Sequence, residues 1–136
     1  WWESDHARLY GRETIESAKA KGIYRQKFAF TAYSESSEDS IDVPIGVGVG
    51  SISMNFGYLQ ELIVAESYRG RGVGASLLKQ VENFCVEHGV RSIALRTDKS
   101  SGAITFYEHH GWEIEHESVD WFGGHACVQM RRWLTR

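Results

Sequence analysis

The sequence predicts a mixed α+β (α/β) fold: a central, mostly antiparallel mixed sheet that contains one strand–helix–strand unit and has helices on both faces. Three observations lead to this prediction. Alternating, β-branched segments interrupted by glycines precede residue 65 and indicate strands joined as hairpins. An amphipathic helix pattern over residues 73–88 lies between two strand patterns. Two final strand patterns are joined by a pair of glycines, which is typical of a hairpin.

The elements follow one another with short connections. We expect a helix over residues 4–21, strands over 23–33, 45–52 and 58–64, a helix over 73–88, a strand over 90–96, a short helix over 103–109, and strands over 112–119 and 125–133. The polar, acidic run 34–40 indicates a solvated hairpin tip. Alternating glycines weaken the strand at 45–52, so it is expected to bend or to carry a bulge. Phe56-Gly57 is expected to turn the chain into the third strand.

Length and composition are those of an ordinary globular domain. The chain has 136 residues, of which 42% are hydrophobic and 24% are charged, so a single domain over residues 1–136 is expected. The net charge of −3 argues against a nucleic-acid partner, and no apolar run is long enough to cross a membrane. No signal-peptide pattern opens the chain, so we expect a cytoplasmic protein. Cys85 and Cys127 lack metal-ligand spacing, as do the adjacent His109 and His110, so no metal site is expected.

A glycine-rich turn joins the third strand to the long helix. Glycines alternate at positions 70, 72 and 74, where the first backbone N–H groups of the helix have no partner within it. Because small residues let a phosphate approach these donors, the turn is a candidate anion site. Arg69 and Arg71 add positive charge beside it. The turn lacks the Gly-Lys-Ser/Thr ending of a P-loop, so that class of phosphate site is disfavoured.

The same turn also fits a second phosphate-binding pattern. Gly70-x-Gly72-x-x-Ala75 matches the dinucleotide fingerprint literally, and Asp98 ends the following strand, where a ribose partner is expected. Residues 66–69 separate the turn from its strand, and the chain ends in a hairpin instead of further strand–helix units. A nicotinamide-dinucleotide binder is therefore an alternative that the surrounding sequence disfavours.

Two blocks of the sequence resemble the signatures of one enzyme family. Residues 62–78 look like the acetyl-CoA signature of the GNAT acetyltransferases, whose core Arg/Gln-x-x-Gly-x-Gly/Ala is matched by Arg69, Gly72 and Gly74. Residues 103–112 (AITFYEHHGW) resemble the second signature, a short helix that ends in Gly-Phe or Gly-Trp. The order and spacing of the blocks are typical of the family. The resemblance covers about residues 44–134 and implies a GNAT-like fold, although the usual first strand is absent or lies before Trp1.

The resemblance implies that acetyl-CoA binds as a cosubstrate along the motif strand and the glycine turn. In this family a bulge separates that strand from its neighbour, so that its backbone can bond the pantetheine and the thioester, while the turn holds the pyrophosphate. The residues implied in cofactor binding are Leu62, Ile63, Val64, Arg69, Gly70, Arg71, Gly72, Val73, Gly74, Ala75, Ser100 and Ala103. Ser100 stands where many members have asparagine. A hydroxyl reaches less far than an amide, so this contact stays open.

The resemblance also implies direct attack of an acceptor amine on the thioester in a ternary complex. Tyr107 occupies the family's tyrosine position and is the candidate general acid, because a neutral phenol can donate to the leaving thiolate. Glu61, beside the expected bulge, is the candidate base, with ordered water as the alternative. The acceptor is a small-molecule or peptide amine that the sequence does not identify. A homodimer is possible, and a non-catalytic acyl-CoA-binding or sensing module of the same fold is the alternative function.

Overall fold

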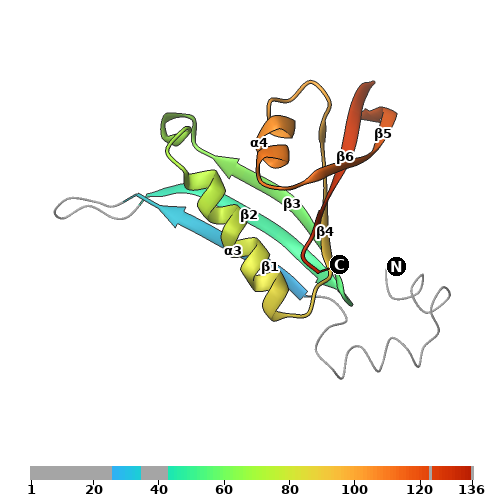
Figure 1. Cartoon of the computed structure of the whole chain (residues 1–136). Helices are drawn as coiled ribbons and strands as arrows, with labels where there is room; N and C mark the ends of the chain where they lie inside the picture. The colour runs from blue at the N-terminus through green and yellow to red at the C-terminus, as the bar shows by residue number, and fades with distance from the viewer. Residues whose placement is uncertain (1–25, 35–42, 123, 136) are drawn as a thin grey trace.

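The fold is given by a computed structural model, which describes residues 26–34, 43–122 and 124–135 (Figure 1). Its elements are the strands β1 (Gln26–Tyr33), β2 (Pro44–Ser53) and β3 (Phe56–Val64), the short 3₁₀ helix η1 (Glu66–Tyr68), helix α3 (Val73–Glu87), strand β4 (Ser92–Asp98), helix α4 (Ala103–His109), and strands β5 (Glu113–Phe122) and β6 (His125–Trp133). The helix predicted over residues 4–21 and nearly all of the polar run 34–40 lie outside the described residues.

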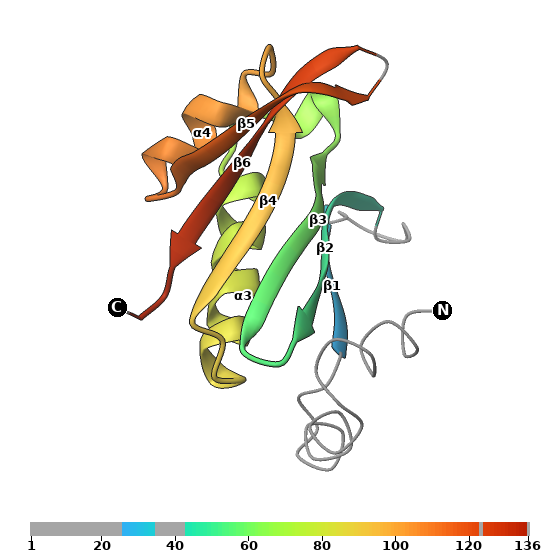
Figure 2. The same ribbon diagram turned by 90° about the vertical axis from the view of Figure 1, so that its right-hand side faces the viewer.

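The strands form one six-stranded sheet in the order β1-β2-β3-β4-β6-β5 (Figure 2). Every neighbouring pair is antiparallel except β3 and β4, which are parallel and are connected through α3. The predicted mixed sheet with one strand–helix–strand unit is therefore confirmed. Helix α3 runs across β1, β2 and β3 on one face of the sheet, and α4 lies near its N-terminal end (Figure 1).

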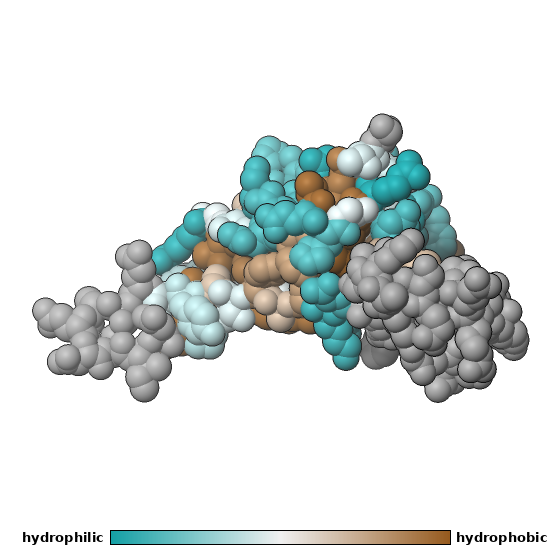
Figure 3. Space-filling model, turned by 90° about the horizontal axis from the view of Figure 1, so that it is seen from below, coloured by the Kyte–Doolittle hydropathy of each residue, from teal (hydrophilic) through white to brown (hydrophobic). Residues whose placement is uncertain are grey.

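The core lies between α3 and the sheet. Helix α3 buries Leu77, Leu78, Val81 and Cys85, as its apolar pattern predicts, and ends before Gly89, whose φ of 73° requires a residue without a side chain. The buried sheet residues packed in the same core include Ile52, Leu59, Ile93, Leu95 and Met130. Among the described helices, none has the length and apolar character needed to cross a membrane. Seen from below, apolar side chains also reach the surface between hydrophilic ones (Figure 3).

The glycines of β2 have a different role from the one expected. A Cβ atom on Gly50 would overlap the carbonyl oxygen of Tyr58 and lie 2.5 Å from Cζ of Phe28, so the strand needs glycine there for space. β2 is bulged against β1 at Ile45, because Ala32 lies opposite Gly46 and the next residue, Tyr33, lies opposite Pro44. The predicted bulge in β2 is therefore confirmed, and a second irregularity lies in β3, opposite Val49 and Gly50. The turn before β3 is displaced: it is formed at Met54, whose φ is 57°, and not at Phe56-Gly57.

Candidate active site

The sheet opens between β3 and β4. These strands pair only at Phe56–Ser92, Gly57–Ile93 and Tyr58–Ala94, although β3 continues to Val64 and β4 continues to Asp98. Beyond Tyr58 and Ala94 the two strands separate, as Figure 1 shows. The opening leaves a stretch of backbone on each strand without a neighbouring strand on that side, while β3 stays paired with β2 and β4 with β6.

A bulge in β3 accounts for this separation. Val49 of β2 lies opposite Glu61, whereas the next residue, Gly50, lies opposite Leu59. Gln60 is thus an extra residue in β3, and such an insertion bends the bulged strand and increases its local twist. The bend carries the last residues of β3 away from β4. The bulge beside Glu61 is where the family resemblance implies one.

The backbone of Leu62 and Val64 points into the opening. The N–H of Ala65 donates to the carbonyl of Ile45 in β2 at 2.8 Å, so Ala65 and, by alternation, Ile63 direct their backbone groups toward β2. The intervening residues Leu62 and Val64 direct theirs to the opposite side, where β4 no longer pairs. The structure therefore brings the backbone of Leu62 and Val64 to the opening, whereas Ile63, also expected to bind the cofactor, directs its backbone toward β2.

The glycine turn lies at the end of β3 and starts α3. Gly70 and Gly72 have φ values of 76° and 83°, which only glycine adopts without strain, and Gly72 is the N-cap of α3 without a capping side chain. Within the described residues, no acceptor bonds the N–H groups of residues 73–75. A hypothetical Cβ on Gly70 or Gly72 would meet no atom within 4 Å, so the space before these donors is open. The arrangement is a helix N-terminus ready for an anion.

The two arginines of the turn have separate local partners. Nε of Arg69 donates to the carbonyl oxygen of Val64 at 3.1 Å, which ties the turn to the end of β3. The guanidinium of Arg71 lies over the ring of Tyr68, 5.2 Å from its centroid. Both arginine side chains are exposed beside the helix N-terminus.

The second sequence block lies against the first. A Cβ atom on Gly74, in the first turn of α3, would lie 3.5 Å from the ring of Phe106 in α4 and 3.6 Å from the side chain of Val64. Ala103 begins α4, and its N–H is accepted by the hydroxyl of Ser101 at 3.1 Å. The N-cap of α4 is Gly102, and the hydroxyl of the preceding Ser101, which the sequence analysis did not single out, satisfies the first N–H of the helix.

Ser100 bonds within the loop between β4 and α4. Its hydroxyl donates to Oδ1 of Asp98 at 2.6 Å, and its backbone N–H donates to the same oxygen at 2.8 Å. These two bonds, together with the more distant charge of His125, lower the pKa of Asp98. The oxygen of Ser100 can still accept a hydrogen bond, but its proton is already used.

Tyr107 and Glu61 lie within electrostatic reach of each other. Tyr107 is 7% exposed and packs against the rings of Phe106 and Trp112, with centroids 5.2 and 5.6 Å away. Burial, followed by the nearby carboxylate of Glu61, raises the pKa of Tyr107 to about 12. None of the described residues forms a hydrogen bond with the Tyr107 hydroxyl. Its O–H is therefore a neutral donor with no partner in this part of the chain, and Glu61 is exposed beside it.

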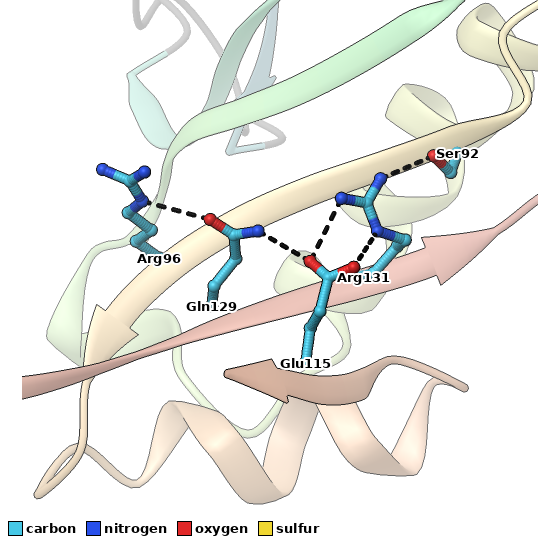
Figure 4. Close-up of polar contacts among 5 residues, drawn as sticks. All are labelled: Ser92, Arg96, Glu115, Gln129 and Arg131. Carbon is cyan, nitrogen blue, oxygen red and sulfur yellow. Dashed lines mark hydrogen bonds and ion pairs between the residues drawn. The ribbon is translucent and has the colours of Figure 1, made fainter. Parts of the chain in front are cut away.

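A polar row beside this site was missed by the sequence analysis. On the sheet face opposite α3, five side chains from β4, β5 and β6 are joined in sequence by hydrogen bonds and an ion pair: Ser92, Arg131, Glu115, Gln129 and Arg96 (Figure 4). The alternation of polar residues in β4 and β6 was visible in the sequence. Their pairing depends on the strand order β4-β6-β5, which no local pattern gives.

Comparison with known proteins decides the family. A model described as "Acetyltransferase (GNAT) family" matches residues 2–112 of the sequence. The chain belongs to the GNAT acetyltransferase family. This result confirms the resemblance of the two signature blocks and favours the acetyltransferase interpretation of the glycine turn over the dinucleotide one.

Individual GNAT relatives agree in sequence or in fold. The chain is 27% identical over 89 residues to YjcF of Bacillus subtilis, an uncharacterized N-acetyltransferase, and the match covers 65% of this chain and 62% of YjcF. It superposes on Ard1 from Thermoplasma volcanium with a TM-score of 0.65 and 25% identity, over 68% of this chain and 65% of that one. The chain thus spans less than two thirds of either relative. A structure of the NatC complex bound to Gag peptide and CoA shares the fold, with a TM-score of 0.70, 23% identity, and coverage of 79% and 71%.

Proposed function

We propose that this GNAT protein transfers the acetyl group of acetyl-CoA to a primary amine, by direct attack of the amine within a ternary complex. The observation that carries the proposal is the opening between β3 and β4. It brings together the backbone of Leu62 and Val64 that no longer pairs with β4, the uncapped start of α3, and the hydroxyl of Tyr107. Coenzyme A complexes among the solved relatives, such as the NatC complex, support the same cosubstrate.

The described residues fit a long, anionic thioester. Its phosphates match the N–H groups of residues 73–75 and the charges of Arg69 and Arg71, because a helix N-terminus and nearby arginines both favour negative charge. Its amide-containing arm matches the backbone of Leu62 and Val64, which would pair with it as a neighbouring strand does. Gly70 and Gly72 keep the approach to the turn open.

Tyr107 is proposed to stabilise the departing thiolate. The amine nitrogen bonds to the acetyl carbon, the carbon–sulfur bond breaks, and the electron pair stays on sulfur. A phenol with a pKa of about 12 stays protonated at neutral pH. A thiol ordinarily has a pKa of about 8.5, so full proton transfer from Tyr107 is uphill and its main contribution is a hydrogen bond to the developing charge.

Glu61 is proposed to receive the proton that the amine loses. An alkyl ammonium has a pKa of about 10.4 and no lone pair, so a base is required near neutral pH. The Glu61 carboxylate is exposed on the open side of the bulge and lies within electrostatic reach of Tyr107. It would accept the proton directly or through a water molecule.

Thermal unfolding with separate ligands tests the cosubstrate. Acetyl-CoA, CoA, NAD and ATP are each added at about one hundred times a trial Kd, where a ligand bound only by the folded protein adds about 2.7 kcal/mol of stability. We expect acetyl-CoA and CoA to raise Tm by several degrees, and NAD and ATP to leave it unchanged. A rise with NAD alone, or with no ligand, would contradict the proposal.

A non-catalytic acyl-CoA-binding module is the second candidate. It is favoured by Ser100, whose hydroxyl proton is bound to Asp98 and so is not offered to the cosubstrate. The two functions differ in turnover. A panel of primary amines assayed by release of free CoA separates them, since a sensing module would bind acetyl-CoA and release none.

A further inference from the structure

In the polar row on the face opposite α3, Arg96 is the arginine that lies at the edge of the active-site opening. Arg131 lies further along the row. Arg131 forms a two-bond ion pair with Glu115, with Nε–Oε1 at 2.7 Å and Nη2–Oε2 at 3.1 Å, and also donates to Ser92 at 2.8 Å. Phe56 and Trp133 hold the same guanidinium from the sides, with ring centroids 5.4 and 5.6 Å away. Arg131 and Glu115 are therefore the fixed part of the row.

Gln129 connects the ion pair of Arg131 and Glu115 to Arg96. Its amide nitrogen donates to Oε2 of Glu115 at 2.6 Å, so its amide oxygen is turned the other way, where it accepts from Nε of Arg96 at 3.3 Å. This bond places the Arg96 guanidinium beside Gln129, at the end of the row. Figure 4 shows Arg96 at one end of the row, beyond Gln129, with Ser92 at the other.

Arg96 and Glu61 lie on the two arms of the opening and on the same face of the sheet. Leu62 is packed toward α3, so the preceding Glu61 faces away from it; Leu95 belongs to the core, so Arg96 also faces away from α3. Counted from the last paired residues, Tyr58 and Ala94, both lie at about the same height: Arg96 is two residues on, and Glu61 is three residues on across the bulge. A carboxylate and a guanidinium thus face one side of the gap.

We propose that the acceptor carries a carboxylate a few bonds from its amine, and that Arg96 binds this carboxylate while the amine faces Glu61. The inference rests on the proposed function and adds the class of substrate. A planar guanidinium matches a carboxylate through paired N–H donors. Gln129 and Glu115 are then positioning residues. A free amino acid and a peptide with an acidic side chain near its N-terminus both present this chemistry.

Acceptor assays on the full chain test the proposal at saturating acetyl-CoA. The acceptors are α-amino acids, the corresponding amino acid amides, and peptide amides that begin with an acidic or a neutral residue. Arg96→Ala is compared with Arg91→Ala, which removes an exposed arginine just before β4, at the other end of that strand. We expect Arg96→Ala to raise KM for carboxylate-bearing acceptors roughly 10- to 100-fold, with little change in kcat or in the KM of the neutral acceptors.

Each outcome of these assays decides the proposal. Wild-type preference for the amino acids assigns the carboxylate to a free amino acid, and preference for the acidic peptides assigns it to a side chain. Equal use of acidic and neutral acceptors, or an equal effect of Arg96→Ala on both, would overturn the inference and leave the proposed acetyltransferase standing. No transfer to any acceptor would overturn both. Gln129→Leu should raise the same KM by a smaller factor, and Arg91→Ala should change none.

Discussion

The phenol of Tyr107 and the carboxylate of Glu61 face one opening in the sheet, although one belongs to α4 and the other to β3. Glu61 contributes to the pKa of about 12 at Tyr107, second to burial. The pair exists because the bulge at Gln60 bends β3 away from β4. A proton acceptor and a neutral donor are thus held on the two sides of the position where we propose that the acetyl group is transferred.

Replacing Tyr107 by phenylalanine tests the donor. We expect kcat to fall by about 10² or more, because the leaving thiolate loses its hydrogen bond, while the Kd for CoA stays within about twofold. Steady-state assays and calorimetric titration with CoA measure the two quantities. Tyr33→Phe, at a 57% exposed tyrosine of β1, is the matched control and should leave both unchanged. Full activity of Tyr107→Phe would remove Tyr107 from the mechanism.

The proposed base predicts a defect that depends on pH. Glu61→Gln should lower kcat about 10²-fold near pH 7, and the defect should shrink as the pH approaches the amine's own pKa of about 10.4, where the acceptor loses its proton without help. Tyr107 would remain protonated over most of this range because its pKa is about 12. The measurement is kcat against pH for both proteins. A defect of constant size at every pH would argue that Glu61 has another role.

A matched pair of variants can distinguish a role of the glycine turn in CoA binding from an effect of backbone strain on stability. Gly72 and Gly89 have φ values of 83° and 73°, and a Cβ atom would meet nothing within 4 Å at either position. Alanine at each should therefore cost a similar free energy of unfolding, about 1 to 2 kcal/mol. Only Gly72→Ala should weaken CoA binding, by tenfold or more, because only that methyl group lies before the start of α3. Equal Kd values for the two variants would exclude the turn as the phosphate site.

Lack of room for a side chain, and not strand flexibility, should explain why β2 needs glycine at position 50. Gly50→Ala should lower the free energy of unfolding by about 3 kcal/mol, since its Cβ would overlap the Tyr58 carbonyl and crowd Phe28. Gly48→Ala should stay within about 1 kcal/mol, because its Cβ would meet Val81 and Leu62 at 3.4 and 3.5 Å, which is ordinary contact. Urea unfolding measures both. Similar losses at the two positions would contradict this explanation.

The ion pair between Glu115 and Arg131 should stabilise the fold in a pH-dependent way. The hydrogen bonds from Arg131 and Gln129 lower the pKa of Glu115 in the folded state. Its contribution is therefore fully present above the unfolded pKa of about 4.3 and is lost as the pH falls through the lower folded value. Glu115→Gln should cost about 1 kcal/mol at pH 7 and progressively less below about pH 4.

Urea unfolding across this pH range measures the Glu115 effect, and Glu117→Gln is the comparison. Glu117 pairs with Lys99 through a single bond at 2.8 Å, and the two side chains are 39% and 57% exposed. Its loss should matter less at every pH because exposed single-bond pairs contribute little. A Glu115→Gln cost that does not change with pH would show that the carboxylate's charge is not the source of the stabilisation.

Local patterns were enough for much of the fold. The spacing of Leu77, Val81 and Cys85 predicted the buried face of α3, and the residues 103–109 predicted for the second helix are the bounds observed for α4. Gly72 and Gly89 marked the two ends of α3. Both have a positive φ, and the preference for glycine at such a position depends only on the local backbone conformation. Such signals depend only on residues that are close together in the sequence, so they can be recognised without knowledge of the rest of the fold.

The tertiary structure decided what depends on pairing between distant strands. The extra residue in β3 is Gln60, and nothing in its local sequence distinguishes it; the bulge appears only when β3 is aligned with β2. The end of pairing beyond Tyr58, the approach of Glu61 to Tyr107, and the row that carries Arg96 all follow from strand order and register. Register is set by the packing of whole faces against the core, so the sequence determined α3, α4 and the glycine turn, and the assembled sheet determined the site.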